Sequence, residues 1–244
     1  MKRIIVFMLC AVMLCISCNA EQYSYYCMRK KNHQRPCLES GFEFITENGG
    51  YYIGKDEKVI YLTFDAGYEN GNVSKILEVL DRRGVKAAFF VLENLIKKEP
   101  ELIKQMDAGG HLVCNHTAKH PDVTKLSREG FESEICRLET VCMEYAGVKL
   151  AKYFRPPEGK FNQKSLEYAN EMGYKTVFWS FAYADWDNSK QPDREYAKQL
   201  MLDNTHNGAI FLLHPTSETN ADIIDEMITC WTAMGYRFGT LDEL

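Results

Sequence analysis

The sequence lacks the features that mark several large classes of protein. Its 244 residues carry a formal net charge of -5 at pH 7, so the chain has no excess of basic residues to bind a nucleic-acid backbone. Aromatic residues are plentiful, but they do not alternate with lysine and arginine. No Gly-x-Gly-x-x-Gly motif is present, as a dinucleotide- or phosphate-binding loop would require. We therefore expect no nucleic-acid partner and no phosphate-handling site.

Cysteine spacing gives no sign of a structural zinc site. Three of the nine cysteines lie in the first 20 residues, and no two of the others have C-x-x-C spacing. The remaining cysteines are even in number, which permits disulfides in an exported chain. Cys27 and Cys37 could close a loop. Cys136 and Cys142 share an expected helix and point to different faces, so we expect no bond between them.

The N-terminal segment has the composition of an export signal. Lys2 and Arg3 precede a continuous apolar run, 4–16, that is too short for a comfortable membrane span. Three alternatives remain open: cleavage after Ala20, lipid attachment at Cys18 in a lipoprotein-like box, or an uncleaved anchor. Each places the rest of the chain outside the cytoplasm, in the extracellular space or the cell envelope, with membrane attachment through this segment in the last two.

The rest of the chain divides into an extension and one domain. Apolar residues make up 45% of the chain and charged residues 26%, as in a folded globular protein. Residues 1–20 form the signal, and residues 21–56 are polar and irregular, which indicates a linker or extension. Residues 57–244 are long enough for a single domain with a substantial core, and we expect a monomer.

Strand and helix patterns alternate from residue 59 onward. Apolar, β-branched and aromatic runs predict strands at 59–64, 87–91, 111–115, 153–154, 176–179, 209–213 and 236–238. Helical spacing predicts helices at 72–83, up to 108, 127–146, 165–172, 193–204 and 221–234. This order indicates a parallel α/β fold and favours a closed or nearly closed barrel over an open sheet.

Polar side chains follow the ends of five of these strands. They are Asp65, the pair His116 and His120, Arg155, the pair Asp185 and Trp186, and His214. Taken singly, each has a structural explanation: a turn or cap acid, a packed histidine, or a surface turn. Together they predict a site, because the carboxyl ends of parallel strands meet on one face and α/β barrels carry their chemistry there.

The order of these motifs resembles that of the polysaccharide deacetylases, the family 4 carbohydrate esterases with a NodB homology domain. Thr63-Phe64-Asp65-Ala66-Gly67 is similar to the family's Thr-Phe-Asp-Asp-Gly, and the segment 116–120 is similar to its metal-binding histidine motif. The segments 155–159, 185–186 and 212–214 resemble the third, fourth and fifth motifs. The resemblance runs from about residue 58 to 241. It implies a distorted (β/α)7 barrel with hydrolytic N-deacetylase activity, and makes 57–244 the catalytic domain.

The resemblance also implies how the proton-transfer residues work. Asp65 would be the general base that takes a proton from water, positioned by Arg155. His214 would protonate the departing amine, with Asp185 tuning its basicity. Amide hydrolysis requires both steps, because water must be activated on one side and the nitrogen protonated on the other.

A metal site is implied by the histidine motif, but one of its ligands is missing. His116 and His120 would hold a divalent ion, usually zinc in this family. The family's second aspartate, normally the third protein ligand, is Ala66 here. Either the ion is held more loosely, or another acid such as Asp187 or Glu69 replaces the ligand, or the domain has lost activity and only binds glycan.

The sequence around the base resembles one subgroup of the family. Gly67-Tyr68-Glu69-Asn70-Gly71 and the run 178–180 leading to Asp185 are similar to the spore-type enzymes that deacetylate peptidoglycan muramic acid. The implied substrate is N-acetylmuramic acid from which the stem peptide has been removed, with closure of muramic δ-lactam afterwards. Chitin oligomers or N-acetylglucosamine units are the alternative. Tyr68, Pro156 and Trp186 are the residues expected to contact the glycan.

Overall fold

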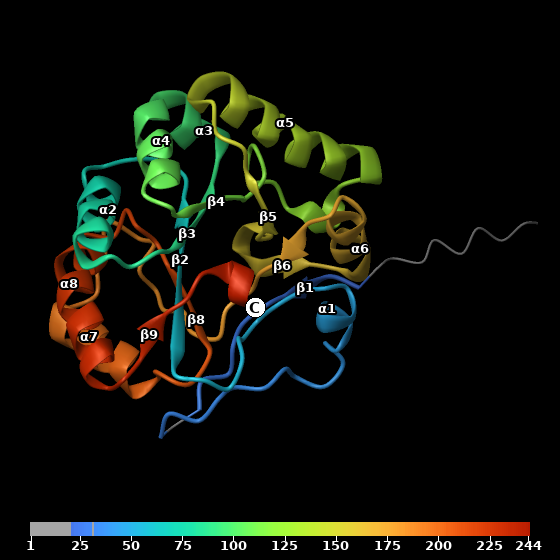
Figure 1. The fold of residues 1–244 in the computed structure, drawn as a ribbon. Helices are drawn as coiled ribbons and strands as arrows, with labels where there is room; N and C mark the ends of the chain where they lie inside the picture. The colour runs from blue at the N-terminus through green and yellow to red at the C-terminus, as the bar shows by residue number, and fades with distance from the viewer. Residues whose placement is uncertain (1–20, 31) are drawn as a thin grey trace, which may run out of the picture.

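A parallel sheet of seven strands forms the centre of the molecule (Figure 1). The computed structural model describes residues 21–30 and 32–244, so the expected signal at 1–20 lies outside the described residues. The strands of the central sheet are β2 (Val59–Ala66), β3 (Ala88–Val91), β4 (Leu112–Asn115), β5 (Ala151–Phe154), β7 (Lys175–Thr176), β8 (Ala209–Leu213) and β9 (Arg237–Phe238). The order β7-β5-β4-β3-β2-β8 runs across the sheet, and β9 pairs with the first two residues of β2.

Helices cover the outside of this sheet (Figure 1). They are α2 (Asn72–Arg83), α3 (Glu93–Lys98), α4 (Pro100–Ala108), α5 (Arg128–Ala146), α6 (Gln163–Glu171), α7 (Arg194–Asp203) and α8 (Glu218–Ala233). Local signals explain several boundaries. Gly84 ends α2 in a left-handed conformation at φ 66°, and the Ser127 hydroxyl accepts from the N–H of Gly130 at the start of α5. Within the described part of the chain, no helix has the length and apolar content of a membrane span.

The expected distorted barrel is confirmed, and its closure is irregular. Strand β7 ends at Thr176, three residues earlier than expected, and the chain beyond it reaches β8 through one parallel bridge between Phe181 and Phe211. The last expected strand, β9, takes no place between β7 and β8. The sheet is therefore a curled half-barrel whose open side is spanned by the segment 177–181.

One predicted helix proved to be two. The helix expected to run to residue 108 is divided into α3 and α4 by Glu99, which has non-helical angles (φ -130°, ψ 55°). The cause is Pro100, which has no backbone N–H and clashes with the preceding turn in a helix interior, but is well suited to the first position of a new helix.

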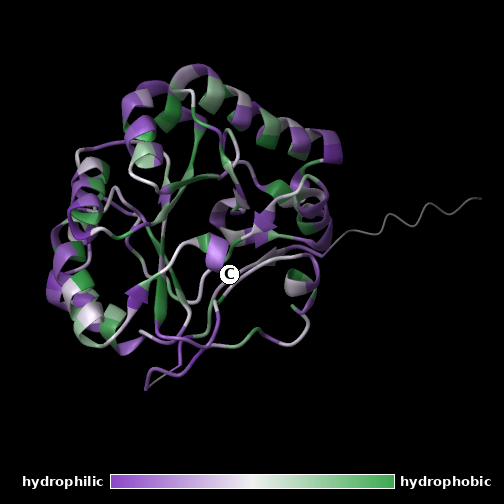
Figure 2. Cartoon of the chain, viewed as in Figure 1, coloured by the Kyte–Doolittle hydropathy of each residue, from purple (hydrophilic) through white to green (hydrophobic). Residues whose placement is uncertain are grey.

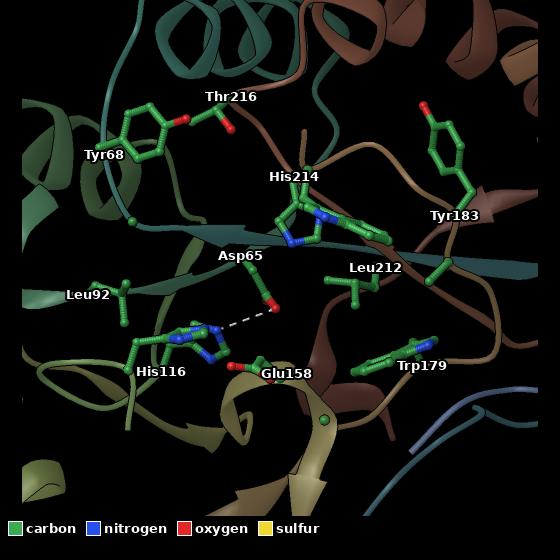
Figure 3. A pocket seen from close by; sticks show the side chains of 15 residues that line it. Asp65, Tyr68, Leu92, His116, Glu158, Trp179, Tyr183, Leu212, His214 and Thr216 are labelled. Atoms are coloured by element: carbon green, nitrogen blue, oxygen red, sulfur yellow. Dashed lines mark ion pairs between the residues drawn. The ribbon is translucent and has the colours of Figure 1, made fainter. Parts of the chain in front are cut away.

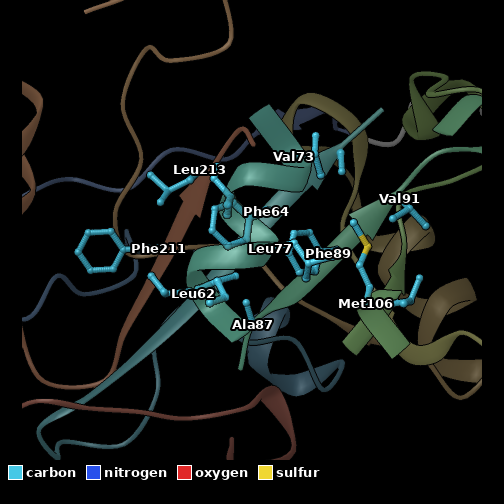
Figure 4. Close-up of a cluster of buried hydrophobic side chains, with 14 of the residues drawn as sticks. Leu62, Phe64, Val73, Leu77, Ala87, Phe89, Val91, Met106, Phe211 and Leu213 are labelled. Atoms are coloured by element: carbon cyan, nitrogen blue, oxygen red, sulfur yellow. The ribbon is translucent and has the colours of Figure 1, made fainter. Parts of the chain in front are cut away.

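Side chains on the strands alternate between two apolar layers. On β2, Ile60, Leu62, Phe64 and Ala66 face the helices, where they join an apolar cluster that includes Phe89 of β3 (Figure 4). The intervening side chains of β2 and β3 face the inside of the curl. Figure 2 shows hydrophobic residues along the central strands and alternating hydrophobic and hydrophilic residues along the helices, as expected for strands covered on both faces and helices with one exposed face. The period of two decides which side chains can reach the inside.

The extension packs against the barrel. Strand β1 (Tyr23–Ser24) pairs antiparallel with β6 (Lys160–Phe161), and α1 (Phe44–Glu47) follows. Tyr25 and Ile45 are buried in the inner cluster, and Tyr51 bridges Val177. All six cysteines after residue 20 are free thiols, so the possible loop closure between Cys27 and Cys37 is not formed.

Candidate functional site

A cavity of about 610 Å³ opens where β2, β4 and β8 end (Figure 3). Six of the nine residues expected in the site line it: Asp65, Tyr68, His116, His120, Trp186 and His214. Arg155 and Asp185 are fully buried behind the wall, and each contacts one of the lining residues. Pro156 is buried and is not among the lining residues, so its expected place on the substrate surface is not supported.

Arg155 holds Asp65 in a fixed orientation. The guanidinium donates from Nη1 to Asp65 Oδ1 at 2.7 Å, from Nη2 to Thr63 Oγ1 at 2.8 Å, and from Nε to the carbonyl of Val177 at 2.9 Å. It also lies 4.1 Å from the ring centre of Phe90. A planar fork with this many partners has little freedom to move. The family resemblance implied that Arg155 positions Asp65, and the structure brings the two groups into contact.

The electrostatics keep the Asp65 carboxyl ionised. Burial alone would raise its pKa, but the charges of Arg155, His116 and His214 lower it more, so the pKa lies below its ordinary value. The second oxygen of Asp65 lies 3.6 Å from Nε2 of His116 and faces the cavity. A carboxylate that is ionised at neutral pH and open to the cavity can accept a proton from water.

Asp185 orients His214 and makes its imidazole more basic. Its carboxylate accepts from His214 Nδ1 at 2.7 Å, from the His214 backbone N–H at 2.8 Å and from Asn220 Nδ2 at 2.7 Å. Burial lowers the pKa of His214, but the hydrogen bond and charge of Asp185 raise it more, so the pKa lies above its ordinary value. With Nδ1 committed to Asp185, Nε2 is the nitrogen left to face the cavity.

The two metal-motif histidines lie together on the loop after β4. Their ring centres are 5.0 Å apart, and both rings line the cavity. Nδ1 of His116 donates to the carbonyl of Arg155 at 2.8 Å, which leaves the lone pair of Nε2 directed at the cavity. Burial lowers the pKa of His116 to about 4, so the ring is neutral at pH 7. A neutral imidazole with its other nitrogen hydrogen-bonded is the state that binds a divalent ion, so these residues fit one.

No third protein ligand is assembled around them. Among the described residues, no group of three or more histidine, cysteine or acidic side chains is arranged to hold a metal ion. Ala66 lies in the apolar layer between sheet and helices. Glu69 caps α2 by accepting from the N–H of Ser74 at 3.0 Å, and Asp187 accepts from the N–H of Ser189 at 2.9 Å. Neither acid replaces the missing ligand.

Aromatic and apolar side chains complete the cavity. Trp186 is 61% exposed and its ring centre lies 6.2 Å from that of His214. Tyr68 is partly exposed and accepts a hydrogen bond from Asn188 at 2.6 Å. Trp179 also lines the cavity, which its sequence pattern did not predict, because the apolar run that contains it indicated a strand and not a segment that crosses the open side of the barrel.

Comparison with known proteins identifies the family. The polysaccharide deacetylase family matches residues 53–177, half of the chain. The chain belongs to the polysaccharide deacetylase family. Members of this family are metal-dependent hydrolases that act on carbon–nitrogen bonds, and several of the relatives act on cell-wall polysaccharides.

Individual deacetylases resemble the chain over most of its length. It is 38% identical to the peptidoglycan-N-acetylmuramic acid deacetylase PdaA of Bacillus subtilis. The 218 aligned residues cover 88% of this chain and 83% of that protein. The solved structure of PdaA, a family 4 carbohydrate esterase, matches with a TM-score of 0.88 over 93% of this chain and 97% of that one. A peptidoglycan-N-acetylglucosamine deacetylase of Bacillus cereus is 31% identical over 208 residues, covering 83% of this chain and 74% of that protein.

The fold also occurs without activity. A CE4 family pseudoenzyme from Bacillus anthracis is 28% identical and matches with a TM-score of 0.74 over 80% of this chain and 68% of that one. Family membership alone therefore does not decide between a catalytic and a glycan-binding role, and the side chains of the site carry that argument.

Proposed function

We propose that this chain is an N-deacetylase of peptidoglycan that hydrolyses the acetamido group of N-acetylmuramic acid residues. The observation that carries the proposal is the arrangement of two opposed pairs around one cavity: the Asp65 carboxylate, bound by Arg155, and the His214 imidazole, bound through Nδ1 by the Asp185 carboxylate, which raises its pKa. The similarity to PdaA supports the choice of muramic acid as the sugar.

Asp65 begins the reaction. Its free oxygen accepts a proton from a water molecule in the cavity, and the water oxygen attacks the carbonyl carbon of the acetamido group. Arg155 keeps the carboxylate ionised and holds its orientation through the attack. Because Arg155 is itself hydrogen-bonded to the backbone and to Thr63, the base does not have to be reoriented during the reaction.

His214 completes it. As the C–N bond breaks, the protonated imidazole donates the proton on Nε2 to the departing nitrogen, which leaves as a free amine on the sugar while acetate is released. Asp185 stabilises the imidazolium through Nδ1 before this transfer. Leu212 and Trp179 give the cavity apolar surface that suits the acetyl methyl group.

His116 and His120 are the residues that would hold the metal ion, which we propose to be zinc. A bound divalent ion would polarise the carbonyl oxygen and lower the pKa of water. With Ala66 in place of a third ligand, the two histidines would hold it more weakly than a complete set of three protein ligands.

The chemistry of the product and the N-terminal sequence support two further parts of the proposal, the eventual product and the location of the reaction. A free amine on muramic acid can close a lactam with the lactyl carboxyl once the stem peptide is gone, and we propose this muramic δ-lactam as the eventual product, as in spore cortex. We also propose that the chain acts as a monomer outside the cytoplasm, either secreted or attached to the membrane through its first 20 residues.

One experiment separates this proposal from its alternatives. The protein is incubated with peptide-stripped peptidoglycan and with chitin oligomers, each with chelator, with added zinc, and without either, and released acetate is measured. Zinc-dependent acetate release from the peptidoglycan alone supports the proposal. Release from chitin oligomers instead would favour N-acetylglucosamine units. No release from either, with glycan binding retained, would favour a binding domain, which the missing ligand at Ala66 and the similar pseudoenzyme keep in consideration.

A further inference from the structure

The N-terminal extension forms the back of part of the cavity wall. After β1 the chain passes behind Gly159, Trp179 and Ala182, all of which line the cavity. The backbone N–H of Tyr25 donates to the carbonyl of Gly159 at 2.8 Å, and its hydroxyl donates to the carbonyl of Trp179 at 2.9 Å. Cys27 lies against the backbone N–H of Ala182. Two residues of the extension thus reach three residues of the wall.

The ring of Tyr25 supports the same segment by packing. Tyr25 is 6% exposed, and its ring centre lies 4.4 Å from that of Phe178 and 5.2 Å from that of Trp179, which it meets edge-on. Phe178 in turn accepts a hydrogen bond from Arg155 at 3.3 Å through its carbonyl. The segment 177–179 therefore links the extension to the cavity wall and to the arginine that orients Asp65.

The fit at this contact is tight. Gly159 has a left-handed backbone (φ 65°), and a Cβ added there would lie 2.8 Å from the ring of Trp179 and 3.2 Å from the carbonyl oxygen of Tyr25. The neighbouring Glu158 also has positive φ, at 55°, which is costly for a residue with a side chain. The turn at 157–159 is thus held in an unfavourable conformation by what packs around it, and the extension is part of that packing.

We propose that the segment 23–27 is a component of the substrate pocket, with Tyr25 as the positioning residue that fixes Trp179 and Gly159. This inference rests on the proposed function, because it assigns the wall to substrate binding. The hydrogen bonds that join the segment 177–181 to β8 all lie at its end, at Ser180 and Phe181, so they do not hold Trp179 directly. Without the hydroxyl of Tyr25, that segment would be held less firmly and the wall would be a poorer fit to the glycan.

The test compares two neighbouring tyrosines in the full-length chain. Tyr25→Phe removes the hydroxyl and keeps the ring, and Tyr26→Phe is the matched control because Tyr26 is 59% exposed. Amide hydrogen exchange of residues 177–183 should become about tenfold faster in Tyr25→Phe, as expected for the loss of one buried hydrogen bond. It should stay at the wild-type rate in Tyr26→Phe, and exchange in α5 should stay unchanged in both variants.

Kinetics supply the second measurement. With peptide-stripped peptidoglycan, KM should rise about fivefold in Tyr25→Phe while kcat stays within about twofold, since a loosened wall weakens substrate binding. A general loss of folded protein would lower kcat and leave KM unchanged. Unchanged exchange at 177–183, exchange that accelerates throughout the chain, or an unchanged KM would each overturn the proposal. If the wild-type protein releases no acetate, the proposed function fails and hydrogen exchange alone decides whether Tyr25 holds the wall.

Discussion

The pair formed by Arg155 and Asp65 allows a quantitative test that does not depend on turnover. Arg155→Met replaces the buried guanidinium with an apolar chain of similar length. It leaves the Asp65 carboxylate in the wall without its cation, and Thr63 and Val177 without their donor. Removing one partner of a buried ion pair costs about 3–5 kcal/mol, so we expect the free energy of unfolding at pH 7 to fall by about that amount.

A second substitution isolates the charge interaction. Asp65→Asn removes the negative charge, while Arg155 keeps its bonds to two backbone carbonyls and Thr63. In the double variant neither charge is present. It should therefore be more stable than the sum of the two single losses predicts, by roughly 1–3 kcal/mol. The free energies come from urea denaturation with chelator present, so that metal binding does not contribute.

The free energy of unfolding should depend on pH in opposite directions in the wild-type protein and in Arg155→Met. In the wild-type protein the pKa of Asp65 is below its ordinary value, so the stabilisation is complete above about pH 4, the unfolded value, and is lost as the pH falls through the folded pKa. In Arg155→Met, burial raises the pKa of Asp65 instead. Protonation then relieves the buried charge, and the loss of stability should be smaller at pH 5 than at pH 7.

A surface arginine provides the control. Arg128 is about half exposed and pairs with Glu132 at 2.8 Å, so Arg128→Met should change the free energy of unfolding by less than about 1 kcal/mol. The reasoning is refuted if the losses from Arg155→Met and Asp65→Asn are additive in the double variant. It is also refuted if the loss from Arg155→Met is independent of pH.

Three further predictions concern the reaction and the metal. Asp185→Asn should lower kcat by about 10²–10⁴. It should also move the alkaline limb of the pH profile to lower pH, because Asp185 raises the pKa of His214. If the alkaline limb does not move, His214 is not the general acid. Chelation should abolish acetate release while the circular dichroism spectrum stays unchanged, and added zinc should restore it; full activity in chelator would contradict a metal requirement. Ala66→Asp should tighten zinc binding by about 10–100-fold in a calorimetric titration, and an unchanged affinity would place the ion elsewhere.

The sequence predicted the barrel and most of its boundaries because the strands are buried on both faces. Short continuous apolar runs such as 59–64 indicate buried strands when segments with helical spacing of apolar residues separate them. Residues that favour helix ends predicted several boundaries, and Gly84 ends α2 as expected. Motif order then brought Asp65, His116 and His214 to one cavity, since parallel strands end on the same side.

The remaining features depend on contacts that leave no periodic trace. The extension appeared polar and irregular because it packs through single aromatic and apolar side chains such as Tyr25 and Ile45, each far in sequence from its partners. Trp179 could not be assigned to the cavity because its segment crosses the barrel through isolated bridges. Pro156 does not line the cavity for a related reason: Arg155 turns into the barrel interior, and the next residue is buried as well.

Strand parity explains why Ala66 can stand in this site. Thr63 and Asp65 point into the curl and reach Arg155, so their neighbours Phe64 and Ala66 point to the helices. A methyl group fits that apolar layer without cost. Because Ala66 is the last residue of β2, the longer side chain of an aspartate could turn past the end of the strand toward His116 and His120, whereas a carboxylate left in the layer without the metal would be buried at a cost in stability. Ala66→Asp should therefore bind zinc more tightly and yet unfold more easily once the ion is removed. A restored ligand would raise the zinc affinity while lowering the free energy of unfolding of the metal-free protein. An acid that only disrupts the core would lower that free energy without raising the zinc affinity.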